Sequence, residues 1–245
     1  MSISRFYTPE NLELEIVTAL PSNASTHASR VLRLTVGDHV TLFNGDGYDY
    51  LCELMTVTKS TVTAKVGTKI LVSSESPLNI TLLQAISSGD RMDNTIQKAI
   101  ELGVNKIQPI NSQRSLIKLA GERAEKRKEH WQNVVISACE QSGRAIVPQV
   151  HSAITLANWL SHNPLQANST RITLSPTATQ NLQDLLSPNG EIYLLIGAEG
   201  GLTQDEIQLA STQGFKPVQL GKRILRTETA ALAAVSAMQV IWGDF

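Results

Sequence analysis

A glycine-rich bend interrupts the stretch Leu194-Leu195-Ile196-Gly197-Ala198-Glu199-Gly200-Gly201-Leu202-Thr203. A second bend lies in the block Leu220-Gly221-Lys222-Arg223-Ile224-Leu225-Arg226-Thr227-Glu228-Thr229-Ala230. Each block reads as a buried apolar strand that turns and then begins a helix. Glycine and short side chains at a bend let the main chain approach a ligand closely. We therefore expect the two bends to form one pocket, built mainly from backbone groups.

Strands alternate with helices around these blocks. The apolar patterns predict strands over residues 78–85, 106–110, 171–174, 191–196 and 217–220. They predict helices over residues 91–102, 122–141, 204–213 and 229–242. Alternation of this kind is typical of a mostly parallel sheet. The C-terminal part of the chain is therefore predicted to be an α/β domain spanning residues 78–245.

The first part of the chain has a different pattern. β-branched and aromatic residues predict short strands over residues 4–7, 15–20, 39–43, 48–59 and 61–70, with one helix over 23–34. The run Asn44-Gly45-Asp46-Gly47 favours a hairpin turn because these residues tolerate positive φ. Strands this short close most naturally into a small β-barrel. We expect this domain to span residues 1–72, with a linker over residues 73–77.

The bulk properties are those of an ordinary water-soluble chain. The composition is 42% hydrophobic and 18% charged, and no run of 18 apolar residues suggests a membrane span. The first residues do not resemble a signal peptide. Cys52 and Cys139 are expected to be free, buried thiols, and the protein is expected in the cytoplasm. The net charge of −1 argues against a chain-wide electrostatic grip on nucleic acid but allows a local basic face.

Several common catalytic and binding motifs are missing from the sequence. The glycines at 197–201 are not spaced as in a dinucleotide fingerprint, and Gly221-Lys222 is followed by Arg223 rather than by the Ser or Thr of a phosphate-binding loop. There is no Gly-x-Ser-x-Gly elbow. The five histidines are scattered without metal-ligand spacing. We expect neither a metal enzyme nor a serine hydrolase.

Bends of this kind can present unpaired backbone groups to the edge of a flat heterocycle. Glu199 has two interpretations: it complements the dipole of the following helix, or it points at a ligand hydroxyl or a substrate proton. Lys222, Arg223 and Arg226 gather beside the second bend. They form either a solvated surface or a contact for an anionic partner.

Both blocks resemble the RsmE family, the uracil-N3 methyltransferases of 16S ribosomal RNA. Three further stretches are similar to the family in the same order: Arg30-Val31-Leu32-Arg33-Leu34, residues 95–104 and residues 138–144. The resemblance covers nearly the whole chain. It implies an N-terminal PUA-like β-barrel and a C-terminal SPOUT α/β domain threaded into a trefoil knot, which is an exception to the rule against knotted connections. It also implies a homodimer.

The resemblance further implies S-adenosylmethionine as cofactor. The expected cofactor-binding residues are Leu174, Ser175, Ile196, Gly197, Glu199, Gly200, Gly201, Leu220, Gly221, Ile224, Leu225, Thr229 and Ala230. Family members commonly have proline where this chain has Ala198. That exchange frees φ at the bend but keeps Glu199 and the glycines, so we expect binding to persist.

The implied reaction is methyl transfer to N3 of a uridine in the assembled small ribosomal subunit. Arg226 or Arg223 would offset negative charge on the uracil, and Glu199 is a candidate proton acceptor. The expected RNA-binding residues are Arg30, Arg33, Arg91, Lys98, Arg114, Arg144 and Lys222. The target base would be flipped out for access.

Two other functions stay open at this point. The chain is alternatively a knotted methyltransferase that modifies a ribose hydroxyl or a guanine, or a non-catalytic RNA-binding protein that keeps an adenosine pocket. The sequence leaves unspecified which uridine is modified, which group takes the proton and how two subunits share the RNA.

Overall fold

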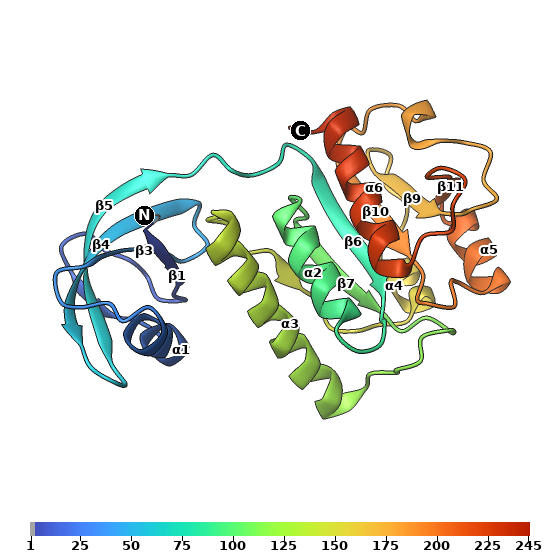
Figure 1. The fold of residues 1–245 in the computed structure, drawn as a ribbon. Coiled ribbons are helices and arrows are strands. Elements are labelled where there is room, and N and C mark those ends of the chain that lie inside the picture. Colours follow the sequence, from blue (N-terminus) through green and yellow to red (C-terminus); the bar gives the residue numbers. More distant parts are fainter. Residues whose placement is uncertain (1–2) are drawn as a thin grey trace. The chain divides into compact units, whose positions relative to one another are not determined.

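The computed structural model describes residues 3–245. Met1 and Ser2, with which the expected first domain begins, lie outside the described residues. The chain divides into two units. The first contains the residues up to Glu75 together with Cys139–Val147, and the second contains Ser76–Ala138 and Pro148–Phe245 (Figure 1). The expected division at residues 72 and 78 therefore missed the segment Cys139–Val147, which belongs to the first unit.

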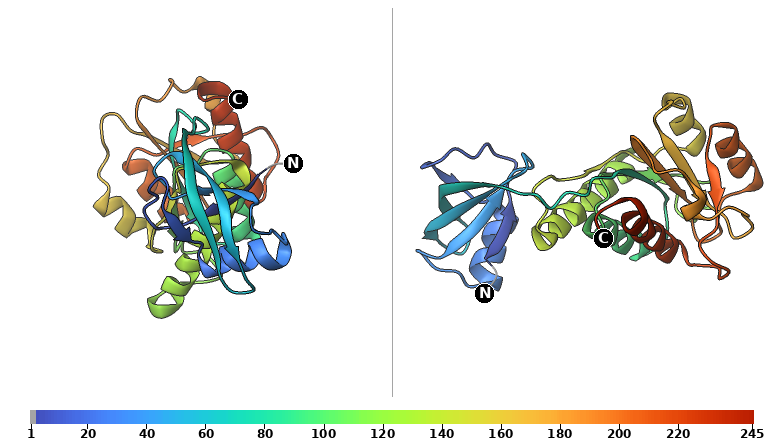
Figure 2. Two further views of the ribbon diagram at one scale, coloured as in Figure 1. Left: turned by 90° about the vertical axis from the view of Figure 1, so that its left-hand side faces the viewer. Right: turned by 90° about the horizontal axis from the view of Figure 1, so that it is seen from above.

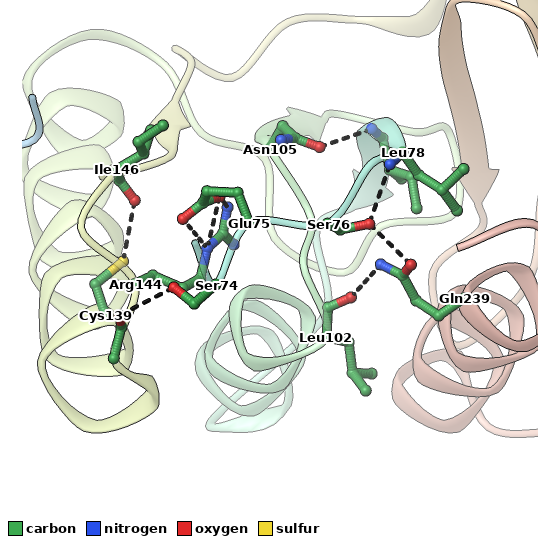
Figure 3. A network of polar contacts seen from close by, with 12 residues as sticks. Ser74, Glu75, Ser76, Leu78, Leu102, Asn105, Cys139, Arg144, Ile146 and Gln239 are labelled. Carbon is green, nitrogen blue, oxygen red and sulfur yellow. Dashed lines mark hydrogen bonds and ion pairs between the residues drawn. The ribbon is translucent and has the colours of Figure 1, made fainter. Parts of the chain in front are cut away.

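Polar contacts explain why this segment joins the first unit. Arg144 is buried and forms an ion pair with Glu75, while Arg5 donates a hydrogen bond to the Arg144 carbonyl at 3.1 Å. The backbone N–H of Tyr7 donates to the Glu140 carboxylate at 3.0 Å. Figure 3 shows Glu75 and Arg144 beside Cys139. These partners are far apart in sequence, so no local pattern could have indicated them.

The first unit is built on a five-stranded sheet in the order β1-β3-β4-β5-β2. Its strands are β1 (Ser4–Tyr7), β2 (Val17–Ala19), β3 (His39–Phe43), β4 (Tyr48–Val57) and β5 (Val62–Leu71). β1 pairs with β3 in parallel and the other pairs are antiparallel. The predicted hairpin turn joins β3 to β4, and Gly45 and Gly47 there have φ of 94° and 87°. Alternate residues such as Val40, Leu42, Leu54 and Val62 are buried in one core.

The helix predicted over residues 23–34 is shorter and irregular. It consists of α1 (Ser22–Thr26) and the π-helical turn η1 (His27–Val31). The Ser29 hydroxyl donates to the Ser25 carbonyl at 2.7 Å and competes for the acceptor that an α-helical bond would use. Leu32 N–H instead bonds the His27 carbonyl at 3.0 Å, and Arg33 takes a positive φ of 55°. The local side-chain bonds thus widen and end the helix.

The second unit contains a six-stranded, all-parallel sheet in the order β11-β9-β10-β6-β7-β8. The strands are β6 (Asn79–Ala85), β7 (Lys106–Ile110), β8 (Gln149–Val150), β9 (Thr170–Leu174), β10 (Glu191–Ile196) and β11 (Lys216–Val218). Between them lie α2 (Arg91–Glu101), α3 (Gly121–Ser142), α4 (Leu156–His162), the 3₁₀ turn η2 (Leu182–Asp184) and α5 (Gln204–Thr212), and α6 (Thr227–Trp242) follows the last strand. The predicted parallel α/β arrangement is confirmed, whereas β8, α4 and η2 were not predicted.

Helices cover both faces of this sheet (Figures 1 and 2). α4 and α5 pack on one face, where Trp159, Leu160 and Phe215 share a core with Leu83 and Leu195 of the strands. α2 and α6 pack together on the other face. This arrangement leaves the C-terminal ends of the strands free to carry loops.

A buried glutamine ties α6 to the end of α2. The Gln239 side chain donates to the Leu102 carbonyl at 2.7 Å and accepts from the Ser76 hydroxyl at 2.8 Å (Figure 3). A Cβ at Gly103 would lie 2.7 Å from Gln239 Nε2, and Gly103 has a positive φ of 88°. Glycine is therefore required where the two helices meet.

Both cysteines are free and buried, as predicted. Burial raises the pKa of Cys139 to about 12, so its thiol stays protonated at neutral pH. None of the helices within residues 3–245 is long and apolar enough to traverse a lipid bilayer. In the same residues, no group of three or more His, Cys, Asp or Glu side chains is placed to hold a metal ion.

Candidate active site

A cavity of about 420 Å³ opens at the C-terminal ends of β9, β10 and β11, which lie side by side in the sheet. In open parallel sheets this edge is the usual place for a ligand. The two sequence blocks supply most of the wall. The lining residues are Arg91, Leu174, Ser175, Pro176, Ile196, Gly197, Ala198, Glu199, Gly200, Gly201, Val218, Leu220, Gly221, Arg223, Ile224, Leu225, Arg226, Thr227, Glu228 and Ala230.

The first bend closes tightly on itself. Gly201 N–H donates to the Ala198 carbonyl at 2.8 Å, and Gly201 has a φ of 71°. A Cβ at Gly197 would lie 2.8 Å from the Gly201 carbonyl carbon and 2.9 Å from Leu202 N. Those atoms belong to the backbone and cannot swing away, so Gly197 is required by close approach of the chain to itself. The bend also forms with alanine at 198.

The second bend leaves its backbone groups available. Among residues 3–245, the N–H and C=O groups of residues 220–225 find no hydrogen-bond partner. Gly221 has a positive φ of 69°, and a Cβ there would meet no atom within 4 Å. Residues 221–224 are exposed, so water rather than protein can satisfy these groups and a ligand can replace it. This segment can therefore offer both donors and acceptors to the edge of a ligand.

Thr227 holds the two bends together. Its hydroxyl donates to the Gly197 carbonyl at 2.6 Å and accepts from Gln84 Nε2 at 3.0 Å. Thr227 begins α6 and Gln84 lies near the end of β6. Sequence reasoning did not single out either residue, although Thr227 stands within the second block.

Glu199 lines the cavity, and hydrogen bonds hold its carboxylate in place. Its carboxylate accepts hydrogen bonds from the backbone N–H and the hydroxyl of Ser88, both at 2.8 Å, and from Arg91 Nη1 at 3.0 Å. Burial by itself would raise the pKa of Glu199, but these hydrogen bonds outweigh it and hold the pKa below its ordinary value. The carboxylate is therefore ionised at neutral pH and already paired.

The structure brings together nearly all the expected cofactor-binding residues. Thr229 differs, because it is exposed and does not line the cavity. Arg223 and Arg226 do line it, and within the described part of the chain neither guanidinium forms a hydrogen bond or an ion pair. Their charges are thus available to a ligand.

The expected RNA-binding residues occupy different environments. Arg91 lines the cavity, Arg114 donates to the Gly200 carbonyl at 2.8 Å beside it, and Lys98 pairs with Glu101 at 2.8 Å. Lys222 is exposed next to the second bend, and Arg30 and Arg33 are exposed in the first unit.

Arg144 does not fit the expected role in RNA binding. Its side chain is only 3% exposed and is paired with Glu75. A guanidinium buried in this way cannot reach a phosphate, so we withdraw that role for Arg144.

Comparison with known proteins identifies the family. The RNA methyltransferase domain model matches residues 74–239, and the RNA methyltransferase PUA domain model matches residues 20–67. A ribosomal RNA small subunit methyltransferase E of Buchnera aphidicola subsp. Schizaphis graminum is 36% identical over 99% of this chain and 98% of its own length. The chain belongs to the RsmE family.

Solved structures agree with this assignment. An RsmE of Neisseria gonorrhoeae, described as bound to S-adenosyl methionine, is 45% identical with a TM-score of 0.92 over the whole of both chains. The putative methyltransferase Lpg2936 of Legionella pneumophila, described as a complex with the cofactor SAM, is 36% identical with a TM-score of 0.95, also over both whole chains. The predicted RsmE fold, with a PUA-like unit before the α/β unit, is confirmed.

Proposed function

We propose that this RsmE-family chain transfers the methyl group of S-adenosylmethionine to N3 of a uridine in 16S ribosomal RNA, in the cytoplasm. One observation carries the proposal. The two bends that define the family resemblance come together around a single cavity of about 420 Å³. Similar chains of 45% and 36% identity are described with S-adenosylmethionine bound.

The residues of the cavity fit this cofactor. Its volume lies in the range of small-molecule sites. The unpaired backbone groups of residues 220–225 suit the donors and acceptors on an adenine edge. The apolar side chains of Ile196, Leu220 and Leu225 suit its faces. When bound, the cofactor supplies an electrophilic methyl group on a positively charged sulfur.

The arginines beside the second bend suit the uracil. Neutral N3–H is a poor nucleophile, so the site must remove its proton or stabilise the anion that spreads onto O2 and O4. Arg226 and Arg223 line the cavity without internal partners, and we assign them to that negative charge. Orientation of N3 toward the methyl carbon supplies much of the remaining rate enhancement over the uncatalysed reaction.

Glu199 fits a positioning role better than proton transfer. A lowered pKa and three donors make its carboxylate a weak base. Its bonds join the first bend to Ser88 and Arg91, the latter at the start of α2. We therefore assign Glu199 to holding this side of the cavity in place.

We propose that the expected RNA-binding residues contact the assembled small ribosomal subunit. Arg30, Arg33, Arg114 and Lys222 are exposed and suit phosphate contacts. The net charge of −1 gives no long-range attraction to RNA, which is itself negative, so recognition of a folded ribosomal surface is expected to contribute beside local basic contacts. The homodimer and the trefoil knot implied by the family stay predictions.

Mass spectrometry of nucleosides tests the activity. Purified protein is incubated with S-adenosylmethionine and either naked 16S RNA or small subunits from a strain that lacks the modification. We expect 3-methyluridine, formed faster on the assembled subunits. A 2′-O-methylated nucleoside or a methylguanosine would contradict the uracil-N3 assignment, and no methylated product would favour a non-catalytic RNA-binding protein. Equal rates on both substrates would contradict the preference for the particle.

A further inference from the structure

Glu228 differs from the other carboxylate of the cavity, Glu199, because one of its two oxygens lacks a hydrogen-bond partner in the described residues. It lies in the first turn of α6 and lines the cavity. Its Oε2 atom is buried and has no hydrogen-bond partner in the described chain. Its Oε1 atom lies 3.9 Å from Arg91 Nε, which is too long for a hydrogen bond.

Glu199 provides the contrast within the same cavity. Both carboxylates face Arg91, but Glu199 takes the short contact at 3.0 Å together with two bonds from Ser88. Glu228 keeps only the long contact to the same guanidinium. The negative charge of Glu199 is therefore well compensated, whereas that of Glu228 is compensated only in part.

The position of Glu228 on α6 favours a carboxylate. The backbone N–H groups in the first turn of a helix carry partial positive charge, which stabilises an anion there. A buried carboxylate oxygen without a hydrogen bond is nevertheless costly unless another group pairs with it. The Glu228 side chain as a whole is 18% exposed and lines the cavity, so its partly compensated charge suits a ligand that brings a donor or a positive charge.

We propose that Glu228 is the residue through which this cavity recognises positive charge on the methyl donor. This inference rests on the function proposed above. S-adenosylmethionine carries a sulfonium and an α-ammonium, and either cation is suited to this partly compensated carboxylate. Glu228 thereby favours the charged donor over neutral adenosine compounds that fit the same apolar and backbone surface.

Calorimetric titration with three ligands tests the proposal. S-adenosylmethionine has both cations, S-adenosylhomocysteine keeps only the ammonium, and 5′-methylthioadenosine has neither. Glu228→Gln keeps the shape of the side chain and removes its charge. We expect this variant to bind S-adenosylmethionine about tenfold to a hundredfold more weakly, which is the usual contribution of a hydrogen bond to a charged group. Binding of 5′-methylthioadenosine should stay within about threefold, since its neutral contacts remain.

The third ligand identifies the cation. If Glu228→Gln weakens the binding of S-adenosylhomocysteine as much as that of S-adenosylmethionine, Glu228 contacts the ammonium. If the binding of S-adenosylhomocysteine is unchanged, Glu228 contacts the sulfonium. Both outcomes support the proposal. Unchanged affinity for S-adenosylmethionine would overturn it, even if turnover fell. Loss of 5′-methylthioadenosine binding by the same factor would also overturn it, because the cavity itself would then be damaged.

Two further variants secure the comparison. Glu122→Gln removes one negative charge from an exposed ion pair with Lys126 on α3 and should leave all three affinities unchanged. Glu228→Asp keeps the charge but withdraws it by one methylene. It should weaken the binding of S-adenosylmethionine more than that of 5′-methylthioadenosine, and it provides this test even if the glutamine variant folds poorly. Failure of the unaltered chain to bind S-adenosylmethionine would count against the proposed function itself, separately from Glu228.

Discussion

Gly197→Ala should weaken S-adenosylmethionine binding by about tenfold to a hundredfold. The new Cβ would lie 2.8–2.9 Å from the backbone of Gly201 and Leu202, in the bend that forms one wall of the cavity. Overpacking of this kind costs about 1–3 kcal/mol. Because the opposing atoms are main chain, relief requires opening the turn between Ala198 and Gly201. The wall would then lose the shape that the donor needs.

Gly67→Ala is the matched control for this variant. A Cβ at Gly67 would lie 2.8 Å from the Leu51 carbonyl oxygen, so the clash is again with main chain, but Gly67 lies in β5 of the first unit and does not line the cavity. Calorimetry should therefore show a change within about threefold for Gly67→Ala, since its strain does not reach the bend at residues 197–201. Equal losses in the two variants, or none in Gly197→Ala, would show that close packing in the first bend does not shape the binding site.

Arg226→Ala should reduce the rate of methyl transfer by about a hundredfold to a thousandfold, the range seen when one group that stabilises developing negative charge is removed. Arg226 lines the cavity and its exposed side chain has no partner in the described residues, so its guanidinium is free to face an anionic uracil. Affinity for S-adenosylmethionine should change little, because the stabilised charge develops on the RNA base.

Single-turnover assays on small subunits, combined with donor titrations, separate these two effects. Arg226→Lys should recover part of the rate because it restores a positive charge without the planar fork. Arg123→Ala, on the exposed surface of α3, serves as the control. An unchanged rate in Arg226→Ala would remove this residue from the mechanism, and a loss found only in Arg223→Ala would move the role to Arg223.

Local sequence patterns were sufficient for most of the second unit. The strand predicted over residues 191–196 is confirmed, the one predicted over 217–220 forms as Lys216–Val218, and Gly201 and Gly221 after them take positive φ. At the start of α5, Thr203 and Glu206 form a capping box, which depends only on residues close together in sequence. By contrast, β8 is only Gln149–Val150 and depends on pairing with β7, so it has too few residues to show a period.

The environments of charged residues were the hardest part to predict. No local sequence pattern distinguishes Arg144 from Arg91. Arg144 is nevertheless buried against Glu75, whereas Arg91 lines the cavity. Glu199 and Glu228 likewise differ in their hydrogen-bond partners. Ser88 and Arg91 donate to the Glu199 carboxylate, whereas Glu228 Oε2 has no partner in the described residues. Partners of this kind come from distant parts of the chain. They become visible only once the fold is known.

A crystal structure of this chain grown with S-adenosylmethionine tests the central claim most directly. The account predicts the donor inside the cavity between the bends at residues 196–201 and 220–225, with backbone groups of the second bend bonded to its adenine. A donor bound elsewhere on the chain, or bends packed against each other with the cavity closed and no donor present, would contradict it.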